Sequence, residues 1–233
     1  MPSRAFSPWL DRLPDPRQAH KTDYSARTHL WAGISIFLLG ASSRRQFDRE
    51  ADDDTGVFLA NFNRLAGTRA EAVPDNQTVA DYLEKLKSEA LGWIPAEMIR
   101  KLIESRVLEH ERLFGRYLVA IDATGYWFSA TPPADANCLR QTQDGKTRYY
   151  RMVLEAKLVT PSGLALSVAS EFIENKDPEA QRQDCELKAV VRLMDKLKQA
   201  FPRLPICLLM DGLYANQNVL TLCRKHAWNY IIS

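Results

Sequence analysis

Hydrophobic positions divide the chain into two parts with different periodicities. From about residue 26 to residue 112, apolar side chains recur every three or four positions, which indicates helices and not strands. Asp75 or Asn76 is placed to cap one helix, and Pro95 is placed to begin another. The apolar run 30–41 is too short to cross a membrane and predicts a buried helix. We therefore expect a helical N-terminal part.

The pattern changes to a strand type from Arg116 onward. A wholly apolar run typical of a strand buried on both faces ends at Asp122, and a loop is expected from Pro132 past Gly145. The connections between the strands are too short for a helical crossover, so consecutive strands should pair antiparallel. The expected strands cover residues 117–121, 126–129, 150–158 and 164–168.

A helix follows these strands and brings the chain back to the sheet. It should open at Asp177-Pro178, and its apolar stripe reaches Phe201. A second apolar run, 206–210, ends in Asp211, and a helix over 216–226 and a strand over 228–232 complete the pattern. Because a helical crossover normally makes the next strand parallel, the two aspartate-ending strands should point the same way.

These elements predict an α/β fold in two domains. Residues 1–114 form an all-α N-terminal domain, and residues 115–233 form a mixed sheet with flanking helices. Helix pairs in the first domain would either bind DNA or only pack on one another, and the pattern does not decide between the two. The arginine pair Arg44 and Arg45 is compatible with either, since such pairs are usually solvated surface.

Asp122 and Asp211 are the candidate functional residues of the predicted sheet. Ligand sites of open α/β sheets lie at the carboxyl ends of strands, and the ends of adjacent strands lie about 5 Å apart. Two carboxylates within about 6 Å of each other favour a divalent cation that offsets their repulsion, and their hard oxygens favour Mg²⁺ or Mn²⁺. Each aspartate alone also fits an ordinary turn, particularly in Asp211-Gly212.

Composition narrows the function only slightly. A net charge of +2 is small for a protein that wraps DNA broadly, so a DNA-related function must be argued from the site itself. No signal peptide or membrane span is expected, which leaves the cytoplasm as the expected location. Widely spaced cysteines without metal-ligand spacing are expected to be reduced core thiols; they are Cys138, Cys185, Cys207 and Cys223.

The segments 119–125 (VAIDATG) and 208–215 (LLMDGLYA) resemble the first two carboxylate motifs of DDE transposases of bacterial insertion sequences. The helix start at 183–186 and the segment 171–175 are similar to that family as well, so the resemblance covers roughly residues 115–233. It implies an RNase H-like fold. It also implies that two Mg²⁺ or Mn²⁺ ions, bound by Asp122 and Asp211, support DNA cleavage and strand transfer.

The same resemblance implies double-stranded DNA as the partner, both transposon ends and target DNA. The family's third carboxylate, a glutamate on a helix after the last strand, has no counterpart up to Ser233, and Glu171, Glu174 and Glu186 precede Asp211 and do not match its motif. We therefore expect a chain truncated before the third acidic residue, with an RNase H-like core that is incomplete at its C-terminus. Such a chain is not expected to be active alone.

Two other functions follow from the same residues. A fragment without the third carboxylate would act as a regulator that binds DNA ends, forms a homodimer or dimerises with the full-length transposase. A phosphatase with Asp122 as nucleophile is the weaker alternative, because Thr124 stands where such enzymes have a second aspartate.

Histidines and aromatic residues receive no function from the sequence. The histidines are isolated and are expected on the surface or in packing; they are His20, His29, His110 and His226. Four aromatic residues could stack on unpaired bases, but core packing is the expectation; they are Trp127, Phe128, Tyr149 and Tyr150.

Overall fold

The computed structural model describes residues 3–17, 23–52, 55–134, 137–175 and 184–233. The chain divides into two compact units, Met1–Leu91 and Gly92–Ser233. This division lies before the expected boundary at 114/115, because helix α6 (Ile94–Glu104) adds Ala96 and Ile99 to the core of the second unit. Over the described part of the chain, no helix has both the length and the apolar character needed to cross a membrane.

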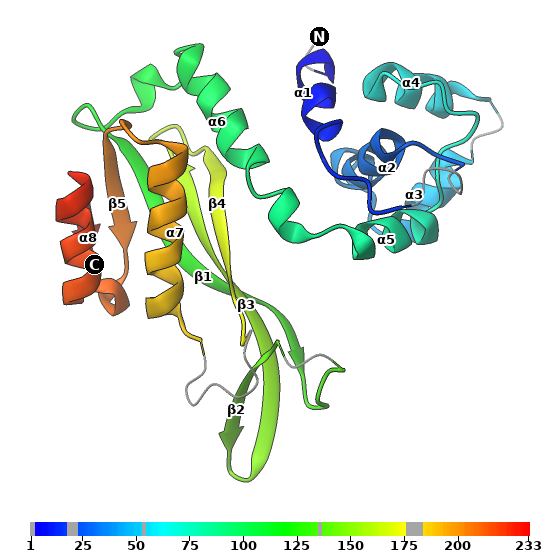
Figure 1. Cartoon of the computed structure of the whole chain (residues 1–233). Coiled ribbons are helices and arrows are strands. Elements are labelled where there is room, and N and C mark those ends of the chain that lie inside the picture. Colours follow the sequence, from blue (N-terminus) through cyan, green and yellow to red (C-terminus); the bar gives the residue numbers. More distant parts are fainter. Residues whose placement is uncertain (1–2, 18–22, 53–54, 135–136, 176–183) are drawn as a thin grey trace. The chain divides into compact units, whose positions relative to one another are not determined.

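The described elements of the first unit are helices joined by loops (Figure 1). The side chains of Ser25, Ser43 and Asp75 each accept a backbone N–H and cap a helix, as predicted for Asp75. The helices are α1 (Ser3–Leu10), α2 (Ala26–Leu38), α3 (Arg44–Ala51), α4 (Val57–Ala66) and α5 (Asn76–Lys85), followed by a 3₁₀ helix (Ser88–Ala90). Their core is aromatic and includes Trp31, Phe47, Phe62 and Tyr82.

Helix α2 corrects one expectation. The apolar run 30–41 is only partly buried, because Trp31 and its neighbours up to Ser35 pack inside the unit while the run's end does not. Phe37 is 85% exposed, and Leu38 and Leu39 are also exposed. An apolar run therefore predicted the helix, but its length overstated the buried part.

The second unit is built on one six-stranded mixed sheet in the order β2-β3-β1-β5-β6, with β4 also paired to β3. Strand β3 pairs antiparallel with β1, β2 and β4, whereas β5 is parallel to β1 and β6 is parallel to β5. The predicted crossover and the parallel pairing of the two aspartate-ending strands are thus confirmed. The strands are β1 (Tyr117–Ser129), β2 (Leu139–Gln143), β3 (Lys146–Val159), β4 (Ala165–Ile173), β5 (Ile206–Met210) and β6 (Asn229–Ile232).

Two predicted strand boundaries were wrong. The segments 117–121 and 126–129 are one continuous strand, β1, whose register with β3 shifts between Gly125 and Trp127. The expected loop before Gly145 contains β2, which joins β3 through a two-residue turn with Asp144 and Gly145 at positive φ. That turn requires left-handed backbone, which glycine and aspartate tolerate.

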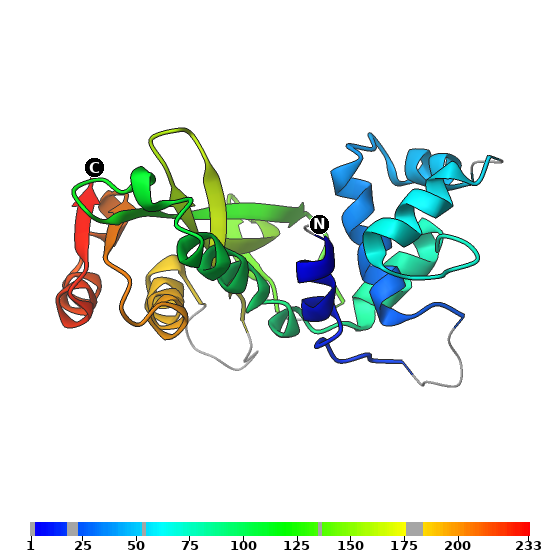
Figure 2. The same cartoon turned by 90° about the horizontal axis from the view of Figure 1, so that it is seen from above.

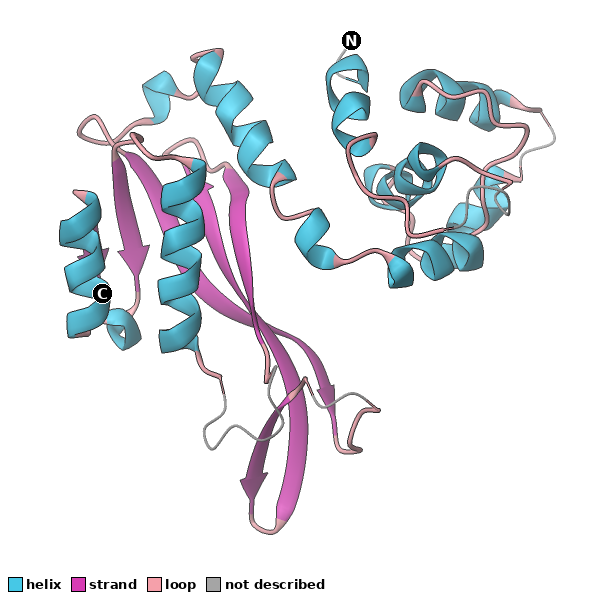
Figure 3. Cartoon of the chain, viewed as in Figure 1, coloured by secondary structure: helices cyan, strands magenta, loops and turns pink. Residues whose placement is uncertain are grey.

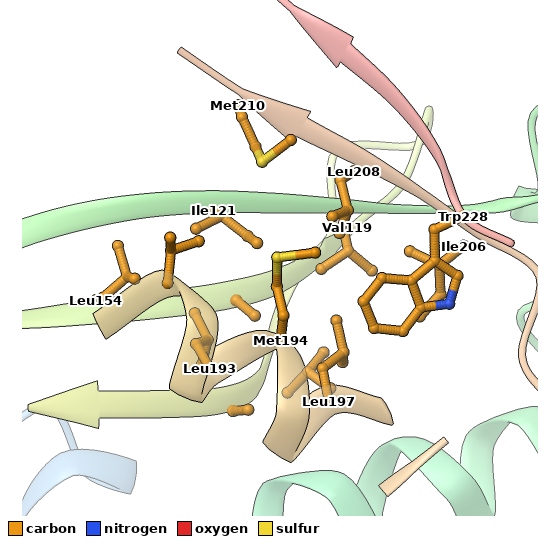
Figure 4. Packing of buried hydrophobic residues seen from close by; sticks show 14 of the residues in the cluster. Val119, Ile121, Leu154, Leu193, Met194, Leu197, Ile206, Leu208, Met210 and Trp228 are labelled. Carbon is orange, nitrogen blue, oxygen red and sulfur yellow. The ribbon is translucent and has the colours of Figure 1, made fainter. Parts of the chain in front are cut away.

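Helices cover one side of the sheet. Figure 2 shows α6, α7 (Glu186–Ala200) and α8 (Gln217–His226) on the same side of the strands, and α6 meets the end of α7 where Arg100 donates to the carbonyl of Ala200. The predicted opening of α7 at Asp177-Pro178 lies outside the described residues. The core between helices and sheet is apolar, and Figure 4 shows Val119, Ile121, Leu193, Met194, Leu208 and Met210 in it.

The opposite side of the sheet, called here the open face, has a different character. Along β1 the residues buried against the helices alternate with half-buried ones such as Leu118 and Ala120, which point to the open face. No helix of the second unit covers this face among the described residues, and Ile231 on β6 is 54% exposed there. The first part of β1 is therefore a strand with one fully covered side and one accessible side.

Candidate active site at the carboxyl edge of the sheet

The two predicted aspartates lie at the carboxyl ends of adjacent parallel strands. The β1–β5 register pairs Val119 with Leu208 and Ala120 with Leu209. The register between the two strands ends at this pair, and Asp122 and Asp211 each lie two residues beyond it; the backbone of Asp211 is still extended (φ −82°, ψ 174°). Neighbouring strands are about 4.8 Å apart, so the two backbones meet at this edge.

Side-chain alternation puts both carboxylates on the open face. Ile121 and Met210 are buried against the helices, as Figure 4 shows, and the next residue of each strand points to the other side. Both aspartates are exposed. Each accepts a backbone N–H at 2.9 Å through Oδ1, Asp122 from Ala123 and Asp211 from Leu213. Asp211 thereby caps the 3₁₀ helix Gly212–Tyr214, so its turn role and its position at the site coexist.

A buried tyrosine lies next to this pair. Tyr214 is 1% exposed, and its hydroxyl donates to Glu186 Oε2 at 3.1 Å, which joins the turn after β5 to the first turn of α7. Burial raises the pKa of Tyr214, and the charges of Glu186, Asp211 and Asp122 raise it further. Three carboxylates therefore act on one hydroxyl that stays protonated and remains a donor.

Glu155 is an acidic residue that the sequence did not single out. It stands directly opposite Asp122 on β3, on the same open face, but its carboxylate is bound by Lys157 Nζ at 3.0 Å and by Ser167 Oγ at 2.7 Å. The alternation over 150–158 places Glu155 on the same strand face as Lys157. However, the pattern alone does not fix which residue of β1 it faces, so no sequence signal could have identified it.

The three glutamates considered as a third ligand have other surroundings. Glu171 points to the helix side of β4, where its carboxylate, 8% exposed, pairs with Arg192 and Lys196 of α7. Glu186 is bound by Tyr214, as described above, and Glu174 follows the end of β4. Arg192 also pairs with Asp184, whose carboxyl loses solvation by burial but has a lowered pKa because of that arginine.

The described residues fit a cation only in part. Asp122 and Asp211 supply hard carboxylate oxygens at one place, which suits Mg²⁺ or Mn²⁺. Within the ranges that the structure describes, no three His, Cys, Asp or Glu side chains come together to hold a metal ion. Two carboxylates alone would leave most of the coordination of such an ion to other ligands.

The remaining candidates have mixed outcomes. Phe128 is 71% exposed, so the expectation that it packs in the core was wrong. Cys138, Cys207 and Cys223 are buried free thiols as expected, whereas Cys185 is exposed at the start of α7. His29 and His226 are buried, which agrees with a packing role, and His20 lies outside the described residues.

Comparisons with known proteins add little to this geometry. No protein-family model matches the chain, and no curated protein matches it. Among solved structures, the chain has a weak likeness to one titled "Crystal structure of a pre-cleavage Mos1 transpososome", with a TM-score of 0.27 and 13% identity. The alignment covers 92% of this chain but only 60% of that one. A likeness of this size assigns neither a fold nor a function.

Proposed function

We propose that the second unit is an incomplete RNase H-like catalytic core of a DDE-type transposase of an insertion sequence, which carries two of the three carboxylates for DNA cleavage at transposon ends and strand transfer and is not expected to be active alone. The single observation that carries the proposal is the β1–β5 register, which brings Asp122 and Asp211 to one edge and one face. An accessible carboxylate pair on adjacent strands is the arrangement that metal-dependent phosphoryl transfer needs.

The order of the elements supports the same proposal. Three long antiparallel strands are followed by a crossover helix, α7, and then by two strands parallel to β1. The carboxylates lie where the strand order reverses between β3 and β5, which is the usual ligand position of open α/β sheets. The fold thereby gives the two aspartates access to a large ligand on the open face.

In this proposal the two aspartates anchor Mg²⁺ or Mn²⁺ at the scissile phosphate. The cation, when bound, polarises the phosphate and lowers the pKa of the attacking water or 3′-hydroxyl. The backbone N–H groups of Ala123 and Leu213 orient the carboxylates through their Oδ1 atoms. Tyr214 and Glu186 hold the turn that carries Asp211 against α7, so that this carboxylate keeps its place relative to β1.

A second function has one observation in its favour. Because no third metal-ligating side chain joins the pair among the described residues, the chain could bind DNA without cutting it. It would then act as a regulator, on DNA ends or on a complete transposase. This function requires DNA binding that is independent of divalent metal.

Nicking of supercoiled plasmid DNA and the metal dependence of DNA binding separate the two functions. If a partner or another ligand completes the two-carboxylate site, the core nicks in Mn²⁺, and more slowly in Mg²⁺, which is the more demanding ion in its geometry. Asp122→Asn or Asp211→Asn should each reduce the rate by about 100-fold or more, since each removes a charged ligand of the ion. Because the incomplete core alone is also expected not to nick, the metal dependence of DNA binding decides: binding to transposon ends that is the same with and without divalent metal favours the regulator, and binding that requires the metal favours the catalytic core.

A further inference from the structure

The long strands β1 and β3 continue beyond the helix-covered part of the sheet. Their outer ends, residues 126–129 and 146–151, join β2 in a three-stranded arm, and Figure 3 shows the strands continuing past the end of α7. The base of the arm is tied to the end of β4, where Asn175 Nδ2 donates to the carbonyl of Cys138 at 3.0 Å. The arm is thus an ordered extension of the sheet.

Positive charge is concentrated on this arm. Residues 139–151 contain Arg140, Lys146, Arg148 and Arg151 against one acidic residue, Asp144, a surplus of three in a chain whose total net charge is +2. Strand alternation divides the four between two faces. Lys146 and Arg148 lie on the helix side, whereas Arg140 and Arg151 lie on the open face.

The open face of the arm combines these two arginines with aromatic rings. The register pairs Trp127 with Arg151 and Arg140 with Tyr149, so these four side chains share one face of the arm. The guanidinium of Arg151 lies over the Trp127 ring, 5.5 Å from its centroid. Just below them, the half-exposed Tyr126 meets Phe172 edge to face. Aromatic and cationic side chains therefore lie together on this face of the arm.

This surface runs on from the carboxylate pair without leaving the sheet face. Asp122 stands opposite Glu155 on β3, and alternate residues from Glu155 along the same strand lead to Arg151 and Tyr149. Tyr149 and Glu155 are six positions apart on an extended strand, a span of roughly 20 Å. One extended ligand could therefore lie on the arm and reach the carboxylates.

We propose that the open face of the arm, formed by Trp127, Arg140, Tyr149 and Arg151, binds an unpaired DNA strand and leads it to the carboxylate pair. The two arginines contact phosphates and the two rings stack on bases. This inference rests on the proposed function for its choice of DNA. The open face of the arm would thus be the surface that binds the DNA strand, whereas the aspartates would act on it.

The chemistry favours an unpaired strand over a duplex. Aromatic side chains bind nucleic acid by stacking on base faces, and those faces are accessible only when the bases are unpaired. A duplex would offer phosphates to the arginines and leave the rings without partners.

Fluorescence anisotropy with a labelled oligo-dT 20-mer in EDTA tests the proposal on the full chain. Trp127→Ala should weaken binding by about 5- to 100-fold, the effect of losing one stacked base, while Trp127→Phe should keep most of it. The pair Arg140→Gln with Arg151→Gln should reduce the slope of log affinity against log salt by about 1.4, since each phosphate contact contributes about 0.7 on single strands.

The matched control is Lys146→Gln with Arg148→Gln, which removes the same charge from the helix side of the same arm. We expect it to change affinity by less than about two-fold. Equal losses of oligo-dT affinity in the two double variants would overturn the proposal, because binding would then depend on the total charge of the arm and not on its open face. Equal binding of the oligo-dT 20-mer by Trp127→Ala and wild type would overturn it as well.

Separate measurements test the two proposals: oligo-dT binding tests the strand-binding surface of the arm, whereas Mn²⁺ binding and DNA nicking test the metal site. Oligo-dT binding is measured in EDTA, where Asp122 and Asp211 hold no divalent cation, so this readout does not depend on the metal site. If the arm variants lose oligo-dT affinity as expected while the wild-type chain neither binds Mn²⁺ nor nicks DNA, the proposed function is wrong. The proposed strand-binding surface on the arm is then still supported. If wild type binds Mn²⁺ and the arm variants bind oligo-dT as wild type does, only the proposed strand-binding role of the arm is refuted.

Discussion

At the scale of single residues, the position of the two aspartates depends on extended backbone at the ends of their strands. Asp122 continues a strand, and Asp211 is the first residue after one, yet both keep extended conformations that put their side chains on the open face. Tyr214 then fixes the turn after Asp211 through its bond to Glu186. Burial and the nearby carboxylates raise the pKa of Tyr214, so its hydroxyl is protonated at neutral pH and donates to Glu186.

Replacing that hydroxyl tests the contact. Tyr214→Phe keeps the buried ring and should lower the free energy of unfolding by about 1 kcal/mol at pH 7, because one hydrogen bond to a carboxylate is lost. The raised pKa of Tyr214 also predicts that wild type loses stability as pH rises past about 10, where only the unfolded chain ionises this tyrosine.

Urea unfolding at pH 7 and pH 10.5 measures both effects. The difference between wild type and Tyr214→Phe should shrink at the higher pH, since the variant has no hydroxyl at this position to ionise in the unfolded state. A difference that is the same at both pH values would show that burial of Tyr214 does not suppress its ionisation.

At the scale of elements, strands and helices were predicted correctly where a single hydrophobic pattern covered the whole element. The apolar runs ending in Asp122 and Asp211 identified β1 and β5, and the amphipathic stripe identified α7. The errors came from residues that fit more than one kind of local structure. Gly125 was taken as a break but allows a bulge within β1, and the polar sequence of β2 hid a strand that the Asp144-Gly145 pair could have revealed as a hairpin. The pairing of Asp122 with Glu155 depends on register, which alternation alone does not fix.

The contact between β4 and α7 gives a prediction at the same scale. Glu171 is almost completely buried, and Arg192 joins it to Asp184. Arg192→Leu should lower the free energy of unfolding by about 1–3 kcal/mol, less than for a fully buried pair, because the arginine is partly exposed and Lys196 still reaches Glu171.

Adding Glu171→Gln to this variant should restore part of the loss, since a neutral amide costs less to bury without its arginine. Thermal unfolding of the two variants and wild type makes the comparison. A double variant that is no more stable than Arg192→Leu alone would contradict this account of the ion pairs.

At the scale of the whole molecule, the chain separates into a helical unit and a sheet unit at Leu91/Gly92. The sheet unit includes α6, whose Ala96 and Ile99 belong to its core. The sequence placed the boundary at the first strand, because helical periodicity before residue 112 does not reveal which core a helix joins.

Two fragments test this division. Residues 92–233 should fold with the circular dichroism and cooperative melting of the sheet unit, whereas residues 115–233 should be less stable by several kcal/mol, because they leave the surface under α6 uncovered. Equal melting of the two fragments would show that α6 does not contribute to the core of the sheet unit.

The central claim is that Asp122 and Asp211 together anchor a divalent cation, and Mn²⁺ binding to the full chain, followed by electron paramagnetic resonance of the free ion, tests it most directly. Asp122→Asn and Asp211→Asn should each weaken binding by about ten-fold or more. Asp144→Asn, which changes an exposed carboxylate in the arm's turn, should leave Mn²⁺ binding unchanged. Mn²⁺ binding that is equal in all four proteins would contradict the claim.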